Sequence, residues 1–210
     1  QANMRTYNLL RYPVKVLLAP GKPHEDVHLI DWDHPESNDF ALAEEVTLKG
    51  GHERRPDIVL YLNGIAVAVI ELKRSSVEVG DGVRQHRTNQ EPLFTELFFT
   101  TSQLLLAGSD SQGLRYGTTG TPEQFFVQWK DEERPDEIGP GSLLDRPLAQ
   151  LCRKERLLDL IRNFVIFDAG QKKVPRPHQY FGIKAAQARV GKREGGVIWH
   201  TQGSGKSILM

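Results

Sequence analysis

The sequence contains very little cysteine, no excess of charge of either sign and no long apolar run. Cys152 is the single cysteine among 210 residues, which excludes an internal disulfide and a zinc site built from several cysteines. One thiol is typical of a reducing compartment, so we expect a cytoplasmic protein. The sequence has no run of about 18 apolar residues to cross a bilayer and no recognisable secretory signal at its start. We therefore expect no membrane partner.

The charge balance excludes no class of function. Lysine and arginine together number 27, and aspartate and glutamate also number 27, so the formal net charge is zero. A basic groove for nucleic acid can be offset by acidic surface elsewhere, so neutrality neither supports nor excludes DNA binding. The length allows one large or two small domains with a proper core. The functional prediction therefore depends on motifs.

A β-hairpin is the clearest structural prediction. Two segments, residues 57–62 and 65–72, are rich in β-branched residues and flank Asn63-Gly64, a strong signal for a tight hairpin turn. A helix is predicted at about residues 81–90. Other apolar segments predict further strands, at residues 14–19, 40–49, 97–109 and 124–130.

The second half of the chain alternates connections and helices. Prolines and glycines predict an exposed connection at residues 135–147. Leucine and isoleucine at helical spacing predict one helix that begins at about Pro147. A second helix is predicted within residues 177–190. It is followed by the apolar strand GGVIW at 195–199, a glycine loop and the start of another helix.

Charged residues stand beside the apolar hairpin at Asp57, Glu71 and Lys73. Side chains alternate between the faces of a strand, so Glu71 and Lys73 point to the same face. Carboxylates suit Mg²⁺, which lowers the pKa of an attacking water, while a lysine orients that water or adds positive charge. The pattern therefore predicts a site for phosphodiester hydrolysis, with Asp57 and Glu71 as metal ligands and Lys73 as a catalytic group.

An ordinary hairpin with solvated charged ends is the competing explanation. A strict two-residue turn pairs Asp57 with Ile70, which places Asp57 on the face opposite to Glu71. The metal site therefore requires a longer loop, a β-bulge or an irregular strand start at Asp57. Glu44 and Glu45 could add a ligand, but an exposed surface explains them equally well.

The stretch RRPDIVLYLNGIAVAVIELKR, residues 54–74, closely resembles the nuclease core of the motor (restriction) subunit of type I restriction enzymes, in the PD-(D/E)xK superfamily. This resemblance implies an α/β (α+β) fold with a mixed, mostly antiparallel central sheet flanked by helices. It also implies a Mg²⁺ site at Asp57 and Glu71, with Lys73 assisting catalysis. These nucleases carry a Gln-x-x-x-Tyr motif on the following helix. Gln85 matches its glutamine, which positions DNA or the water on the metal, and Asn89 replaces its tyrosine.

The segment HTQGSGKS, residues 200–207, follows an apolar segment and contains the final glycine, lysine and serine of a phosphate-binding loop. In such loops backbone N–H groups cradle phosphates, Lys206 reaches the β/γ-phosphates and Ser207 binds Mg²⁺. The segment resembles the loop of superfamily 2 helicases and translocases, although His200 replaces the first glycine; a flexible loop is the alternative. The resemblance implies ATP binding by five residues, Gly203, Ser204, Gly205, Lys206 and Ser207.

Upstream, RPHQYFGIKAA resembles the Q-motif of these motors, which implies that Gln179 reads the adenine edge of ATP. A surface glutamine on an amphipathic helix is the alternative. The resemblances predict an endonuclease domain at residues 1–146, a connecting helix or linker at 147–174 and the start of a RecA-like ATPase domain at 175–210. The 210 residues lack the later motor motifs, so we expect no translocation by this chain alone.

The first functional hypothesis is Mg²⁺-dependent DNA cleavage, coupled in a full-length protein to ATP-dependent translocation. Its implied partners are double-stranded DNA, a modification (methyltransferase) subunit and a specificity subunit. The second hypothesis is a nucleotide-binding regulatory or scaffold module whose charged hairpin is structural. A nuclease fused to a repair helicase is a third, with the same chemistry. A shared face for Asp57, Glu71 and Lys73 favours the nuclease over the scaffold.

Overall fold

The computed structural model describes residues 2–131 and 142–209, so most of the connection predicted at 135–147 lies outside the described residues. The chain separates into two compact units, residues 1–174 and residues 175–210. None of the helices in the described ranges combines the length and the apolar character needed to traverse a bilayer.

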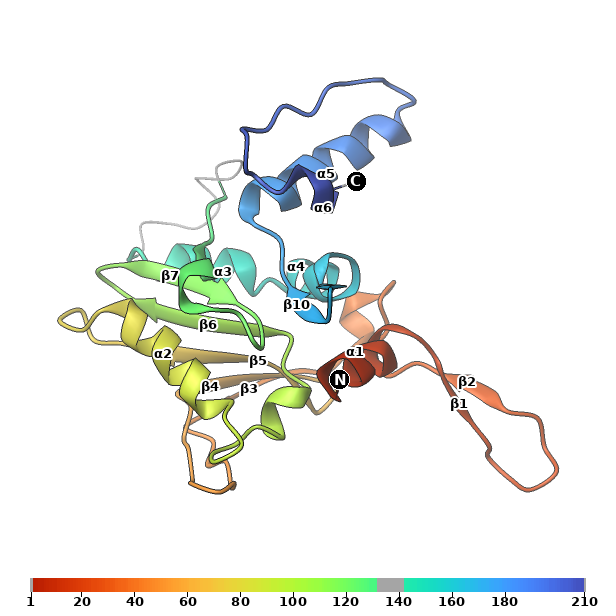
Figure 1. The fold of residues 1–210 in the computed structure, drawn as a ribbon. Helices are drawn as coiled ribbons and strands as arrows, with labels where there is room; N and C mark the ends of the chain where they lie inside the picture. The colour runs from red at the N-terminus through yellow and green to blue at the C-terminus, as the bar shows by residue number, and fades with distance from the viewer. Residues whose placement is uncertain (1, 132–141, 210) are drawn as a thin grey trace. The chain divides into compact units, whose positions relative to one another are not determined.

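A six-stranded sheet in the order β3-β4-β5-β6-β7-β8 forms the centre of the first unit (Figure 1). Strands β5 and β6 are parallel, and all other neighbours in this sheet are antiparallel. The mixed, mostly antiparallel sheet predicted from the sequence is therefore confirmed. The strands are β3 (Phe40–Glu44), β4 (Ile58–Leu62), β5 (Ile65–Leu72), β6 (Leu104–Ser109), β7 (Gly113–Gly117) and β8 (Val127–Gln128).

The predicted hairpin is formed by β4 and β5, and Asn63 and Gly64 make its two-residue turn. Both turn residues have a positive φ, +50° and +77°, which Asn and Gly adopt at little cost. Strand β5 then contains one extra residue, Val67, at a β-bulge. The Val67 carbonyl accepts a hydrogen bond from the backbone N–H of Gln103, just before β6, at 2.7 Å. The bulge is thus held by the neighbouring parallel strand.

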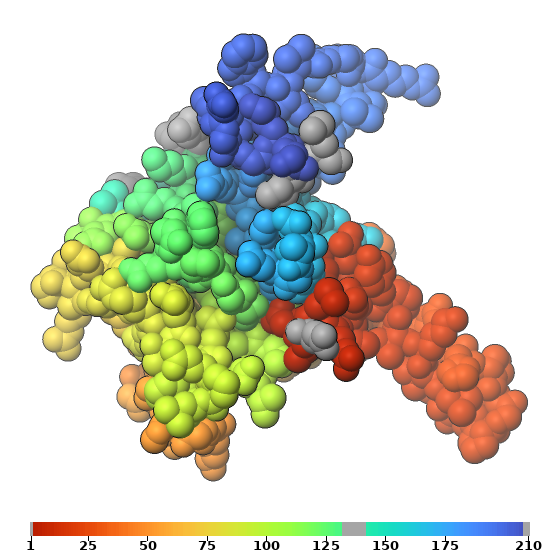
Figure 2. All heavy atoms as spheres, viewed as in Figure 1, coloured from red at the N-terminus to blue at the C-terminus, as the bar shows by residue number. Residues whose placement is uncertain are grey.

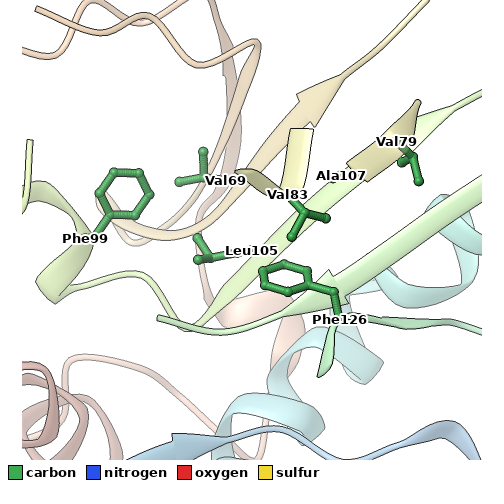
Figure 3. Packing of buried hydrophobic residues seen from close by; sticks show 7 residues of the cluster. All are labelled: Val69, Val79, Val83, Phe99, Leu105, Ala107 and Phe126. Atoms are coloured by element: carbon green, nitrogen blue, oxygen red, sulfur yellow. The ribbon is translucent and has the colours of Figure 1, made fainter. Parts of the chain in front are cut away.

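Helix α2 (Val79–Asn89) connects β5 to β6 and covers one face of the sheet (Figure 1). Its valines pack against strand residues and two phenylalanines in a fully buried cluster, shown in Figure 3. Each such aliphatic side chain contributes about 1.5–3 kcal/mol by leaving water. The predicted helix at 81–90 is confirmed. The cluster consists of Val69, Val79, Val83, Phe99, Leu105, Ala107 and Phe126.

A buried histidine ties α2 to the sheet. His86 is fully buried, and its Nε2 lies 2.7 Å from the Leu106 carbonyl oxygen, so the neutral ring donates from Nε2. Burial lowers the pKa of His86 to about 4, against an opposing effect of the Leu106 hydrogen bond. The ring therefore stays neutral through the physiological range.

Other elements surround the sheet in the first unit. Figures 1 and 2 show that the β1–β2 hairpin extends away from the other elements of this unit. Lys172 of β10 is buried and donates to the Ser102 carbonyl and to Gln103 Oε1, which anchors the β9–β10 hairpin. These elements are α1 (Ala2–Arg11), β1 (Val14–Val16), β2 (Glu25–Val27), the short 3₁₀ turns η1 (Pro35–Ser37), η2 (Phe98–Thr100) and η3 (Glu123–Phe125), β9 (Ile166–Asp168) and β10 (Gln171–Lys173).

The single helix predicted from about Pro147 is wrong. Helix α3 (Asp145–Leu151) ends before Arg153, whose ψ of 137° is not helical and interrupts the helix. Helix α4 (Lys154–Asp159) follows and continues as a π-helical turn, η4 (Leu160–Phe164). The apolar periodicity extends over both helices, so it does not reveal the two non-helical residues, Cys152 and Arg153, that separate them.

The second unit contains α5 (Pro177–Gly191), which confirms the predicted helix, and the short α6 (Lys206–Leu209). The strand predicted at residues 195–199 is wrong. The described part of this unit contains no β pairing, and Val197 and Trp199 are 88% and 89% exposed. A buried parallel strand needs neighbours on both sides, and none is described in this unit.

Two glycines of α2 test how closely the helix approaches the sheet. A Cβ at Gly82 would lie 3.0 Å from the Ala107 Cβ, whereas a Cβ at Gly80 would meet the flexible ends of two side chains, Arg84 at 3.3 Å and Glu123 at 3.6 Å. Both alanine variants gain about 1 kcal/mol of helix propensity. We expect Gly82→Ala to be about 1 kcal/mol less stable than Gly80→Ala, measured by urea unfolding. Equal stabilities would contradict the close approach.

The neutral state of His86 predicts a pH-dependent stability. Between pH 6.5 and about 4 the unfolded chain binds one more proton at His86 than the folded chain does, so stability from this group is lost as the pH falls. His86→Gln keeps an N–H donor but does not titrate. From pH 6.5 to pH 5, wild type should lose about 1.5 kcal/mol relative to His86→Gln in urea unfolding. A constant difference would show that the ring is already charged.

Candidate active site

The β-bulge brings the predicted carboxylates to one face. Beyond it Ile58 pairs with Ile70, so the next step of the register sets Asp57 opposite Glu71. Directly opposite residues of an antiparallel pair share a face. The Leu72 backbone N–H also donates to Oδ2 of Asp57 at 2.6 Å, which holds the Asp57 carboxylate against the end of β5.

Glu71 is a fully buried acid. Burial and, secondly, the nearby Asp57 carboxylate raise the pKa of Glu71 to about 8, and Lys73 opposes this shift. Its Oε2 lies 3.9 Å from Nζ of Lys73 and has no hydrogen-bond partner among the described residues. A buried carboxyl group with an unpaired oxygen, beside a second acid, is costly for folding alone.

Lys73 and Gln85 form a hydrogen bond beside Glu71. Nζ of Lys73, on an 18% exposed side chain, donates to Oε1 of Gln85 at 2.6 Å. Gly82 lies one turn before Gln85, and a Cβ there would be 3.5 Å from both the Glu71 Cβ and the Lys73 Cε. The absence of a side chain at Gly82 lets α2 bring Gln85 down to the lysine.

The donor set suits Mg²⁺ better than a metal that requires an all-protein cage. The described residues contain no cluster of three His, Cys, Asp or Glu side chains able to hold a metal. Two neighbouring carboxylates do suit Mg²⁺, because this ion keeps several waters and uses one or two protein acids. Oε2 of Glu71, which has no hydrogen bond to a described residue, and the neighbouring Asp57 carboxylate are both features that a divalent cation would offset.

Other acids stand apart from this arrangement. Glu44 is exposed at the end of β3, and the Glu45 carboxylate pairs with Arg55 at 3.1 Å. Sequence reasoning gave no role to His86 and none to Asn89 beyond its replacing a tyrosine. Both lie on the face of α2 that Gly82 and Gln85 occupy, and a helical period of 3.6 applied to residues 79–89 could have found them.

In the second unit the glycine loop is folded back on itself. Gly203 and Gly205 have positive φ values, +76° and +80°, as tight phosphate-binding loops require. Nζ of Lys206 donates to the carbonyl oxygens of His200 and Thr201 at 3.1 and 3.2 Å. Ser204 is buried, and Lys206 and Ser207 are exposed.

Gln179 lies at the start of α5 and contacts this loop. Its Nε2 donates to the Ser204 carbonyl at 3.0 Å, and its Oε1 accepts from the Arg176 backbone N–H at 2.8 Å. His178 Nε2 also lies 3.2 Å from the same Ser204 oxygen. The structure therefore brings Gln179 to the loop, as the predicted site requires, and both ends of its amide are engaged within the unit.

Two family models match this chain, one in each of its two units. Residues 1–125 match the family model "Type I restriction enzyme R protein N terminus", and residues 178–210 match that of the SWI2/SNF2 ATPase. The type I restriction enzyme HindI endonuclease subunit of Haemophilus influenzae is 33% identical, over 99% of this chain and 22% of that protein. The SauCOLORF180P endonuclease subunit of Staphylococcus aureus is 22% identical, over 81% of this chain and 18% of its own length.

The chain thus spans about a fifth of the length of these curated relatives. The family match covers more than half of the 210 residues and includes the bulged hairpin, Asp57, Glu71, Lys73 and Gln85. On this basis the chain belongs to the family of type I restriction enzyme R protein N-terminal regions.

Proposed function

We propose that the first unit is a PD-(D/E)xK nuclease domain that hydrolyses phosphodiester bonds of double-stranded DNA with Mg²⁺. In this proposal Asp57 and Glu71 hold the metal, and Lys73 and Gln85 act beside it. The supporting observation is the register of the β4–β5 hairpin, in which the bulge sets Asp57 opposite Glu71. A scaffold hairpin has no need of a bulge that gathers two acids and a lysine on one face.

The chemistry follows from the neighbours of each side chain. When bound, Mg²⁺ would supply an acidified water and neutralise developing negative charge on the phosphate. The Lys73 ammonium, oriented by Gln85, offers a fixed positive charge at the same place. Asp57 is held by the Leu72 N–H, so its carboxylate loses little freedom on binding a cation.

For the second unit we propose ATP binding by Gly203, Ser204, Gly205, Lys206 and Ser207, with Gln179 contacting the adenine. The positive φ values of both glycines and the contact between α5 and the loop support this assignment. Nucleotide binding would require Lys206 to leave the His200 and Thr201 carbonyls and turn toward phosphate.

We further propose that cleavage is coupled to ATP-dependent translocation in the full-length protein, which acts with a modification and a specificity subunit. The relatives are endonuclease subunits of type I restriction enzymes, which favours these partners over those of a repair helicase.

The cleavage assignment is tested in the full-length protein assembled with its partner subunits. We expect Asp57→Asn, Glu71→Gln and Lys73→Met each to lower the rate of DNA cleavage at least about 100-fold, because each removes a charge from one site. The readout is conversion of supercoiled plasmid to linear DNA.

ATP hydrolysis by the same preparations serves as the control and should stay at the wild-type rate. Lys206→Ala should lose ATP hydrolysis and, because cleavage is proposed to depend on translocation, DNA cleavage as well. Wild-type cleavage by Glu71→Gln would refute the metal site.

Metal binding by the 210-residue chain can be measured directly by calorimetry with Mn²⁺. Because the pKa of Glu71 is about 8, a cation must displace a proton below that pH. We expect the Mn²⁺ affinity to fall as the pH is lowered from 8.5 to 6.5, by up to about tenfold per unit below pH 8. Binding should disappear in Asp57→Asn and Glu71→Gln, and a pH-independent affinity would contradict the protonated state of Glu71.

A further inference from the structure

Asn89, near the C-terminal end of α2, contacts the buried carboxyl group of Glu71. Its side chain is 1% exposed, and its Nδ2 donates to Oε1 of Glu71 at 3.5 Å. Asn89 lies seven residues after Gly82 and four after Gln85, so all three occupy one face of the helix. Glu71 is therefore approached by an amide from α2 as well as by Lys73.

The position of Asn89 is fixed by its own backbone. Its carbonyl oxygen accepts two hydrogen bonds from Thr95, from the backbone N–H at 3.2 Å and from Oγ1 at 3.0 Å. Thr95 is itself buried, at 3% exposure. The end of α2 is thus closed by a buried residue, which fixes the backbone from which the Asn89 side chain reaches Glu71.

The two oxygens of Glu71 are in different situations. Oε1 faces the Asn89 amide, whereas Oε2 has no hydrogen-bond partner in the described ranges and lies 3.9 Å from the Lys73 ammonium. An amide N–H is a donor that a carboxylate accepts without a change of net charge. The Asn89 contact therefore makes Oε1 of Glu71 different from Oε2 and adds no charge beside the carboxyl group.

We propose that Asn89 is a positioning residue for metal binding, whose amide holds Oε1 of Glu71 and leaves Oε2 available to the cation. This inference rests on the proposed metal site at Asp57 and Glu71. It also gives a physical meaning to the departure from the Gln-x-x-x-Tyr pattern, because an amide replaces a phenol and both are hydrogen-bond donors. Groups that orient metal ligands in this way typically change metal affinity 10–100-fold.

The test is Mn²⁺ calorimetry on Asn89→Leu, which keeps the approximate shape of the side chain but has no N–H donor. Thr88→Val is the matched control, because Thr88 lies on the same helix and its Oγ1 donates to the Arg84 carbonyl within that helix. We expect about tenfold weaker Mn²⁺ binding by Asn89→Leu and wild-type binding by Thr88→Val. Urea unfolding and circular dichroism verify that each variant is folded, and Asn89→Ala provides a second, smaller replacement.

A second measurement separates positioning from a general structural role. In the assembled full-length enzyme, Asn89→Leu should require about tenfold more Mn²⁺ for half-maximal cleavage, and excess Mn²⁺ should restore most of the maximal rate. Wild-type Mn²⁺ affinity in folded Asn89→Leu and Asn89→Ala would overturn the proposal, as would a lowered rate that excess metal does not restore. If Glu71→Gln also binds Mn²⁺ normally, the proposed metal site itself fails, whereas a loss confined to Glu71→Gln rejects only the role of Asn89.

Discussion

The β-bulge at Val67 is the constraint on which the arrangement of the candidate site depends. A tight turn alone fixes a register that separates Asp57 from Glu71, and one extra residue reverses that outcome for every position beyond it. The bulge persists because its carbonyl is bonded to the strand that follows α2, through Gln103. The hairpin and the parallel crossover thus determine the positions of the acids jointly, and neither would do so alone.

The arrangement also buries Glu71, which is unfavourable for folding. Its strand is apolar on both faces, so an acid in it sits where a valine or leucine would stabilise the fold by about 1.5–3 kcal/mol. The protein keeps an acid there beside Lys73 and the Asn89 amide, and no described residue hydrogen-bonds to its Oε2. Sites that depart from good local packing in this way are commonly functional ones.

Local chemistry made much of the fold predictable, and tertiary pairing explains the rest. Asn63-Gly64 specifies its turn through backbone conformations that few other residues adopt, so the hairpin could be predicted. The sequence left a longer loop, a bulge and an irregular strand start as alternatives, because the choice depends on pairing with Gln103, 36 residues after Val67. Residues 195–199 have the composition of a buried strand, yet composition cannot supply a neighbouring strand to bond with. The contacts of Lys73 and Asn89 likewise depend on how closely α2 approaches the sheet at Gly82.

All the residues of the candidate site lie between Asp57 and Asn89, in one uninterrupted stretch of hairpin and helix. The loops that must close to bring them together are therefore short, and the entropy lost in closing them is small. Contacts of this kind form quickly during folding, because they do not wait for distant segments to meet. The geometry of the candidate site is therefore determined mostly by contacts within residues 57–89. The main contribution from the rest of the chain is β6, on which this segment packs.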